Sequence, residues 1–118
     1  MLLTLALLVA APQTQAQMTQ SAATAYVRAD AEMTRAWKVT YAHMKRRDAQ
    51  YISRGGGFGY AAALLESQRA WLKFRDTECV IEGGEFAGGS MQAMAMSSCR
   101  TRLTNARTAQ LKSLMWSR

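Results

Sequence analysis

Several residue types are scarce in this 118-residue chain, and each scarcity argues against a class of protein. There is one Pro, and Val and Ile are few, a composition that disfavours β-sheet and permits long helices. With one histidine, His43, and two cysteines that form no CxxC motif, the chain offers neither a recognisable zinc site nor a thioredoxin-like redox motif. We therefore expect no bound metal and no small-molecule cofactor.

Recognisable sets of catalytic residues are also missing. His43 lies in a basic stretch beside Lys45 and Arg46, and no Ser-His-Asp set can be assembled around it. Glu78 and Glu82 are four residues apart on one helical face, whereas a retaining glycosidase needs two carboxylates that converge on the substrate from across a cleft. We therefore expect a binding protein, and not an enzyme.

Charge is absent from residues 1–16, within which residues 2–11 are almost wholly apolar. This run is too short to cross a bilayer as a helix, which needs about 20 residues. It is typical of the apolar core of a secretory signal, with the small residue Ala16 as the candidate cleavage point. We expect a signal peptide at residues 1–16, a single domain at residues 17–118 and a periplasmic or secreted bacterial protein. The alternative is that the apolar run forms a buried helix of the fold.

The rest of the chain is divided by two glycine clusters, at residues 55–59 and 83–89. Apolar residues recur at helical spacing in three segments, residues 19–48, 60–82 and 90–115, and Ser90 fits the N-cap of the third. Glycine is permissive in turns and costly inside helices, so both clusters predict loops. The sequence predicts an all-α domain, a small antiparallel three-helix bundle with two Gly-rich loops. The expected apolar stripes contain Tyr26, Met33, Trp37, Tyr41 and Met44, then Leu64, Trp71, Leu72 and Cys79, then Cys99, Leu103, Ala106 and Leu114.

Two charged residues, Asp30 and Arg75, fall in the middle of these apolar stripes. An unpaired buried charge is very costly, so each needs a partner. We expect the two to be buried and to pair across two helices as a structural ion pair, with Arg107 as a candidate third member. The alternative is that they line a polar cleft between the helices.

The two cysteines and the net charge bear on location and partners. An even number of cysteines in a short exported chain predicts a disulfide, which antiparallel packing of the second and third segments would form between Cys79 and Cys99. The net charge of +7 favours anionic partners such as lipid head groups, nucleic acid or acidic polymers. The basic residues are nevertheless spread along the whole chain, as on a solvated surface.

One stretch resembles a known family. Residues 68–79, Gln-Arg-Ala-Trp-Leu-Lys-Phe-Arg-Asp-Thr-Glu-Cys, resemble the central motif of the LprI-type lysozyme-inhibitor N-terminal domain, found in exported bacterial proteins. The chain departs from the family pattern at two positions outside this motif. Ser21 stands where many members carry a cysteine, and Ala93 stands where Pro is common. The resemblance implies an exported helical domain and, for at least one relative, lysozyme inhibition. Further matches are Gly88 to Ser90, Met94, Cys99, Leu103, Thr104, Arg107 and Leu111, and, more loosely, Thr14 to Met18, Tyr26, Ala29 and Asp30.

Two kinds of partner remain open. A lysozyme-type protein is usually strongly basic, so an inhibitor should present acidic groups to it. Glu78, Glu82 and Glu85 are then the candidate contact residues. The alternative is a cationic module that binds an anionic envelope polymer or a membrane surface. Its predicted patch contains Arg100, Arg102 and Arg107, together with Arg69 or Lys73.

Overall fold

The computed structural model describes residues 3–6, 12–50 and 57–116, and this part of the chain contains three helices and no strand. They are α1 (Gln15–Gln50), α2 (Tyr60–Gly84) and α3 (Gln92–Ser113), so the all-helical prediction is confirmed. None of the helices in these ranges has an apolar stretch long enough for a bilayer span. Most of the apolar run at residues 2–11, and the glycines at positions 55 and 56, lie outside the described residues.

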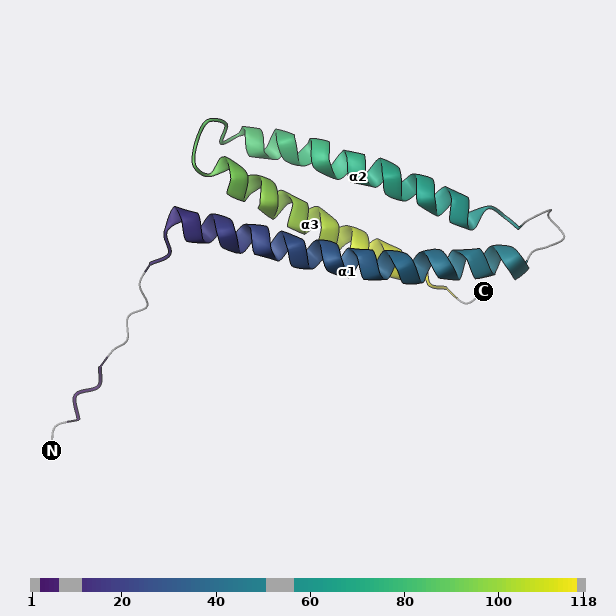
Figure 1. Cartoon of the computed structure of the whole chain (residues 1–118), viewed down its shortest axis with the longest axis horizontal. Helices are drawn as coiled ribbons and strands as arrows, with labels where there is room; N and C mark the ends of the chain where they lie inside the picture. Colours follow the sequence, from purple (N-terminus) through teal and green to yellow (C-terminus); the bar gives the residue numbers. More distant parts are fainter. Residues whose placement is uncertain (1–2, 7–11, 51–56, 117–118) are drawn as a thin grey trace.

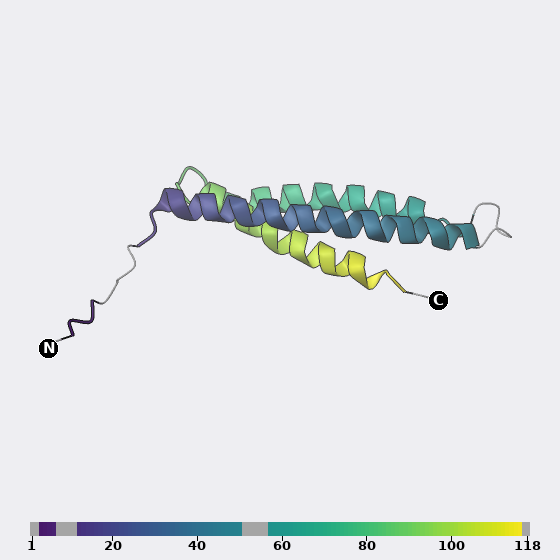
Figure 2. The same cartoon turned by 60° about the horizontal axis from the view of Figure 1, so that its bottom comes forward.

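The three helices lie side by side along one long axis. Helix α2 runs back along α1, and α3 turns again and runs in the same direction as α1 (Figure 1). Helix α3 packs against both others near the α2–α3 turn and diverges from α2 towards its own C-terminus (Figure 2). The beginning of α1 and the α2–α3 turn therefore share one end of the molecule (Figure 1).

The apolar core is small and contains much methionine. Its buried cluster consists of Met33, Ala36, Met44, Leu64 and Leu111. Unbranched methionine side chains adapt to irregular gaps, which suits a core formed by helices that diverge. Partly buried side chains cover its margins, namely Trp37, Tyr41, Tyr60, Ala61, Trp71, Leu72 and Leu114.

The buried face of α1 is rotated from the predicted stripe. Small residues, Ala29, Ala36 and Thr40, are buried, whereas Tyr26 and Trp37 are only half-buried. Small side chains let α3 approach α1 closely, and the Thr40 hydroxyl donates a hydrogen bond of 3.1 Å to the Leu111 carbonyl. Large aromatic rings do not fit at such a close approach, so they lie at the edge of the interface.

Helix α2 begins with a cap that comes from another helix. Its own N-cap residue, Gly59, has a φ of +101° and no side chain. The Asp48 carboxylate, near the end of α1, instead accepts hydrogen bonds from the backbone N–H groups of Gly59, Tyr60 and Ala61 at 2.9–3.0 Å. The start of α2 is thereby fixed to the end of α1.

The predicted cap of α3 is wrong. The helix begins at Gln92 after Met91, and no side chain caps it, so Ser90 lies in the preceding turn. Backbone hydrogen bonds, such as Phe86 N–H to the Gly83 carbonyl and Gly89 N–H to the Phe86 carbonyl, hold this turn instead. The first N–H of α3, that of Gln92, likewise donates to a backbone group of the turn, the Gly89 carbonyl, at 3.4 Å.

Candidate functional site

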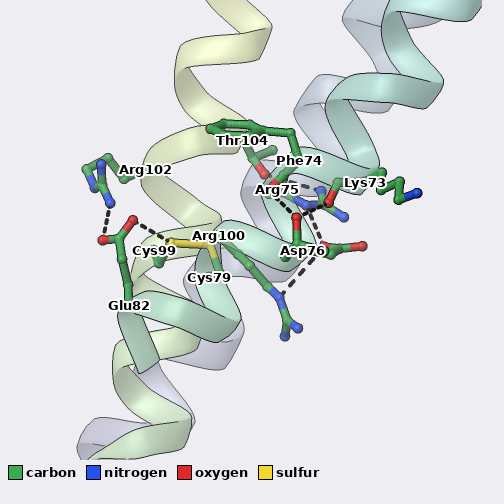
Figure 3. The surroundings of a disulfide bond; sticks show 11 residues. Lys73, Phe74, Arg75, Asp76, Cys79, Glu82, Cys99, Arg100, Arg102 and Thr104 are labelled. Carbon is green, nitrogen blue, oxygen red and sulfur yellow. Dashed lines mark hydrogen bonds and ion pairs between the residues drawn. A yellow bond between two sulfur atoms is a disulfide. The ribbon is translucent and has the colours of Figure 1, made fainter. Parts of the chain in front are cut away.

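A disulfide joins α2 to α3 just behind their connecting turn (Figure 3). The Cα atoms of Cys79 and Cys99 lie 5.5 Å apart, and both side chains are buried, which confirms the predicted bridge. On the turn side of the bridge, Gly83 is packed so closely against α3 that a Cβ atom would overlap Met96. The turn is therefore held on a rigid base.

Charge is unevenly distributed along the molecule. Residues 76–99 contain four carboxylates and no Lys or Arg, and residues 1–27 carry no charged side chain at all. The beginning of α1 lies at the same end as the α2–α3 turn (Figure 1), and Gln15 contacts Met94 there. We call residues 15–27 and 76–99 the acidic end. All fifteen Lys and Arg residues of this +7 chain lie outside it in the sequence.

Two carboxylates of the acidic end are neutralised at its border. Asp76 lies 3.0 Å from Arg75 and 3.9 Å from Arg100 (Figure 3). Glu82 forms an ion pair with Arg102 at 2.5 Å. Glu82 also lies 3.2 Å from the sulfur of Cys99, a contact and not a true hydrogen bond because a disulfide sulfur carries no hydrogen.

The other two carboxylates have no ion pair. Within the described residues, neither Glu78 nor Glu85 lies within ion-pair distance of a cation; Glu85 is exposed and Glu78 is half-buried. Apolar side chains near them are exposed as well: Ile81 is 70 %, Phe86 37 % and Met91 40 % exposed. Exposed apolar groups next to charged ones are typical of a surface that binds another protein.

Arg75 lies at the centre of a separate polar cluster between the helices. Its guanidinium lies over the rings of Tyr26 and Trp71, 5.4 and 5.3 Å from their centroids. It contacts Asp30 at 3.3 Å and donates a hydrogen bond of 3.4 Å to Thr104 on α3. Burial by itself would lower the pKa of Arg75, but the Asp76 carboxylate, with smaller contributions from Tyr26 and Asp30, raises it.

The two partners of the predicted ion pair differ in burial. The structure places Asp30 and Arg75 in contact, with 7 % of the Arg75 side chain exposed. The expectation that Asp30 is buried is wrong, since 44 % of its side chain is exposed. Asp30 lies at the edge of the α1–α2 interface, where its carboxylate keeps water on one side and avoids most of the cost of desolvation.

Arg107 does not belong to this pair. Its guanidinium donates hydrogen bonds to Gln68 at 2.9 Å, Ser67 at 3.1 Å and Gln110 at 3.3 Å. These partners are neutral, and burial lowers the pKa of Arg107. Arg107 therefore connects α3 to α2 through hydrogen bonds of its charged group to neutral side chains.

A groove of about 430 Å³ opens between α1 and α2 beside Arg75. Both charged groups of the Asp30–Arg75 pair line it, together with apolar and aromatic side chains. This is the polar cleft that sequence reasoning left open as an alternative to a purely structural pair. The other residues that line the groove are Tyr26, Met33, Thr34, Trp37, Leu65, Gln68, Arg69 and Leu72.

Within the described ranges, no three His, Cys, Asp or Glu side chains gather into a group that could hold a metal ion.

The structure does not assemble the cationic patch predicted on α3. Arg107 is buried, whereas Arg100 and Arg102 are engaged by Asp76 and Glu82. Arg69 and Lys73 are exposed on α2. The three arginines of α3 therefore hold the fold together and do not form one open surface, because each meets a partner from α2.

These features define a small, disulfide-bridged, all-helical domain. The chain belongs to the lysozyme inhibitor LprI family, whose model matches residues 9–111. It is also similar, with 40 % identity over 91 residues, to an uncharacterized protein of Rhizobium meliloti (strain 1021). That match covers 76 % of this chain and 66 % of the relative, so the chain spans slightly less than two thirds of the relative's length. No solved structure shows a significant match.

Proposed function

We propose that this protein is an exported binding module that blocks a cell-wall-cleaving enzyme of the lysozyme type, and that the acidic end makes the contact. Membership of the lysozyme inhibitor family supports the class of partner. The observation that carries the choice of surface is the separation of charge. Four carboxylates and no base lie within residues 76–99 of a chain whose net charge is +7.

The separation of charge removes an electrostatic objection to this function. A basic enzyme is repelled by a basic inhibitor, and like charges brought together at an interface cost several kcal/mol. If the enzyme approaches the acidic end, the charged side chains that it meets without an ion-pair partner are Glu78 and Glu85. Because charge beyond about 10 Å is screened at ordinary salt concentrations, the distant cations then oppose binding only weakly.

The shape of the acidic end also suits an inhibitor. Ile81, Phe86 and Met91 are exposed around the turn, and the buried disulfide holds the two helices that support it. A rigid apolar tip loses little conformational entropy on binding and can enter a cleft. Glu82 is less suited to direct contact than Glu78 and Glu85, because Arg102 already neutralises it.

The test is inhibition of a basic lysozyme, measured as the rate at which the enzyme clears a cell-wall suspension. The parent chain should inhibit, and the double variant Glu78→Gln/Glu85→Gln should need roughly tenfold more protein, since close charge pairs at interfaces contribute strongly. Phe86→Ala should also weaken inhibition. The matched control is Glu32→Gln/Glu66→Gln, which removes two exposed acids outside the acidic end.

The control separates local from overall charge. Both double variants raise the net charge by two, so a uniform electrostatic effect would weaken both equally. The proposal requires the control to inhibit like the parent. Equal loss in the two variants would reject the acidic end as the contact surface, and no inhibition by the parent would reject lysozyme of that class as the partner.

The other finer expectations remain proposals. The periplasmic or secreted location and the signal peptide at residues 1–16 agree with an enzyme partner that acts on the cell wall. Helix α1 begins at Gln15, so cleavage after Ala16 would shorten its first turn by two residues. The expectation that the chain is not an enzyme is supported by a family of inhibitors. The second candidate function, binding of anionic envelope material, is supported by another surface, the face of α1 that carries exposed cations.

A further inference from the structure

The outward face of α1 carries five exposed cations, Arg28, Arg35, Lys38, Lys45 and Arg46. At 100° per residue, they lie within an arc of about 100° that points away from the buried side of the helix. The residues that α1 buries, among them Met33, Thr40 and Met44, lie on the opposite side. The sequence predicts only cations spread along a solvated surface, because it does not show which of them lack a carboxylate partner.

These five cations have no acidic partners. Within the described residues, no carboxylate lies within ion-pair distance of any of them. Lys45 rests over the ring of Tyr41 at 4.8 Å, which leaves its charge uncompensated. The one carboxylate at the margin of the face, Glu32, pairs with Lys112 of α3 at 3.5 Å. The face is therefore purely cationic, unlike α3, whose arginines have partners.

We propose that this face of α1 docks on a membrane surface rich in anionic phospholipids. The cations extend from Arg28 to Arg46, about 27 Å along a continuous helix at 1.5 Å per residue. An anionic bilayer presents phosphate charge over a plane, which a long convex helix face can contact at all five positions. Clusters of four to eight Lys and Arg on a helix are the usual size for such binding.

A soluble anionic strand fits this face less well. Proteins that bind single-stranded nucleic acid place aromatic platforms in a basic groove. The outward arc of α1 between Arg28 and Arg46 has no aromatic side chain, and its uncharged positions include Ala31 and Ala42. Arg28 and Arg35 border hollows at the margins of this face. The five cations together nevertheless follow the convex side of one helix, which is complementary to a plane and not to a strand.

This inference goes beyond the proposed function because it uses another surface and another partner. The acidic end comprises residues that precede Arg28 in α1 and the α2–α3 turn, which lies beside the beginning of α1 (Figure 1). A chain bound through residues 28–46 would therefore leave Glu85 and Phe86 of the turn outside the lipid contact. The membrane would hold the protein while the acidic end stays available.

The experiment is co-sedimentation of the full, disulfide-bonded chain with vesicles, either phosphatidylcholine alone or phosphatidylcholine with 30 % phosphatidylglycerol. The parent should bind the anionic vesicles and lose this binding as salt rises from 50 to 500 mM. Arg35→Gln/Arg46→Gln should bind them about 25-fold more weakly, since each cation near an anionic surface contributes about fivefold. The matched control, Arg69→Gln/Lys73→Gln, removes the same charge from α2.

Each outcome decides for or against the proposal. It requires the α2 control to change binding by no more than a few-fold while circular dichroism shows both variants folded. Equal loss in both variants would overturn it, because net charge and not the α1 face would then govern binding. Equal binding to neutral and anionic vesicles would overturn it too, since apolar contacts would then dominate. Tighter salt-sensitive binding to heparin or single-stranded DNA than to anionic vesicles would make the partner a soluble polymer.

Discussion

Arg75 shows how one buried charge can be accommodated by unequal partners. Its own side chain is 7 % exposed, but the carboxylates of Asp30 and Asp76 are 44 % and 52 % exposed. The arginine therefore carries most of the desolvation, and its guanidinium contacts the rings of Tyr26 and Trp71. Cation–π contacts of this kind contribute about 0.5–2 kcal/mol each. The pair stabilises the fold mainly through the packing of the arginine.

This asymmetry predicts different costs for the two partners. Asp30→Ala should lower the free energy of unfolding by only about 0–1 kcal/mol, as for exposed ion pairs. Arg75→Ala should cost about 2–4 kcal/mol, because it removes a buried side chain that touches all three helices. Urea unfolding followed by circular dichroism measures both. Equal losses, or a larger loss for Asp30→Ala, would contradict this account of the cluster.

At the scale of helices, Asp48 connects two elements in a pH-dependent way. The backbone N–H of Ala61, followed by those of Tyr60 and Gly59, lowers the pKa of its carboxyl below the ordinary value of 3.8, against a smaller opposing effect of burial. A group whose pKa is lower in the folded state stabilises the fold above its unfolded pKa. That contribution is lost as pH falls through the folded pKa, below 3.8.

Asp48→Asn should therefore flatten the acid side of the stability profile. At pH 7 the variant should melt below the parent, since a neutral amide accepts weaker hydrogen bonds from the start of α2. Between pH 5 and pH 2 its melting temperature should fall less than that of the parent. Thermal melts across this pH range provide the measurement, with Glu66→Gln as an exposed control. Parallel curves for Asp48→Asn and the parent would exclude Asp48 as a titrating cap.

The bridge between α2 and α3 supports the turn in the same way as Asp48 supports the start of α2. Cys79 and Cys99 close a loop of 20 residues. In the chain-entropy model such a loop contributes about 3 kcal/mol, so Cys79→Ser/Cys99→Ser should lower the free energy of unfolding by about that amount. Amide hydrogen exchange should increase most in residues 80–98. An unchanged exchange rate there would show that the turn does not depend on the bridge.

Sequence patterns predicted the elements better than their contacts. The segments at residues 60–82 and 90–115 agree with α2 and α3 to within two residues at each end, because a glycine cluster precedes each helix; the prediction of a loop from residue 83 is wrong for Gly83 and Gly84, which end α2. The pairing of Cys79 with Cys99 followed from composition. The rotation of the buried faces could not be predicted, because it depends on the close approach of α1 and α3, which are distant in sequence. The Asp48 cap was missed for the same reason, since Asp48 and Ala61 meet only after the chain turns back.

At the scale of the whole molecule, the most informative feature is the separation of charge between two regions. The sequence shows the cluster of Glu78, Glu82 and Glu85. Which of these carboxylates can contact another protein depends on which of them already form ion pairs within the fold. The structure pairs Glu82 with Arg102 and leaves the half-buried Glu78 and the exposed Glu85 without an ion pair. It likewise pairs the arginines of α3 with residues of α2 and leaves five cations of α1 exposed. Pairing across helices, which a single sequence does not reveal, therefore decides which charges can meet a partner.

The central claim is that the acidic end contacts a basic cell-wall-cleaving enzyme. The most direct measurement is an NMR titration of the isotope-labelled, disulfide-bonded chain with unlabelled basic lysozyme, following every backbone amide. The account predicts that the largest shifts lie in residues 76–99, around Glu85 and Phe86, and that residues 28–46 of α1 change little. Shifts centred on α1 with an unchanged acidic end, or no shifts at any enzyme concentration, would contradict it.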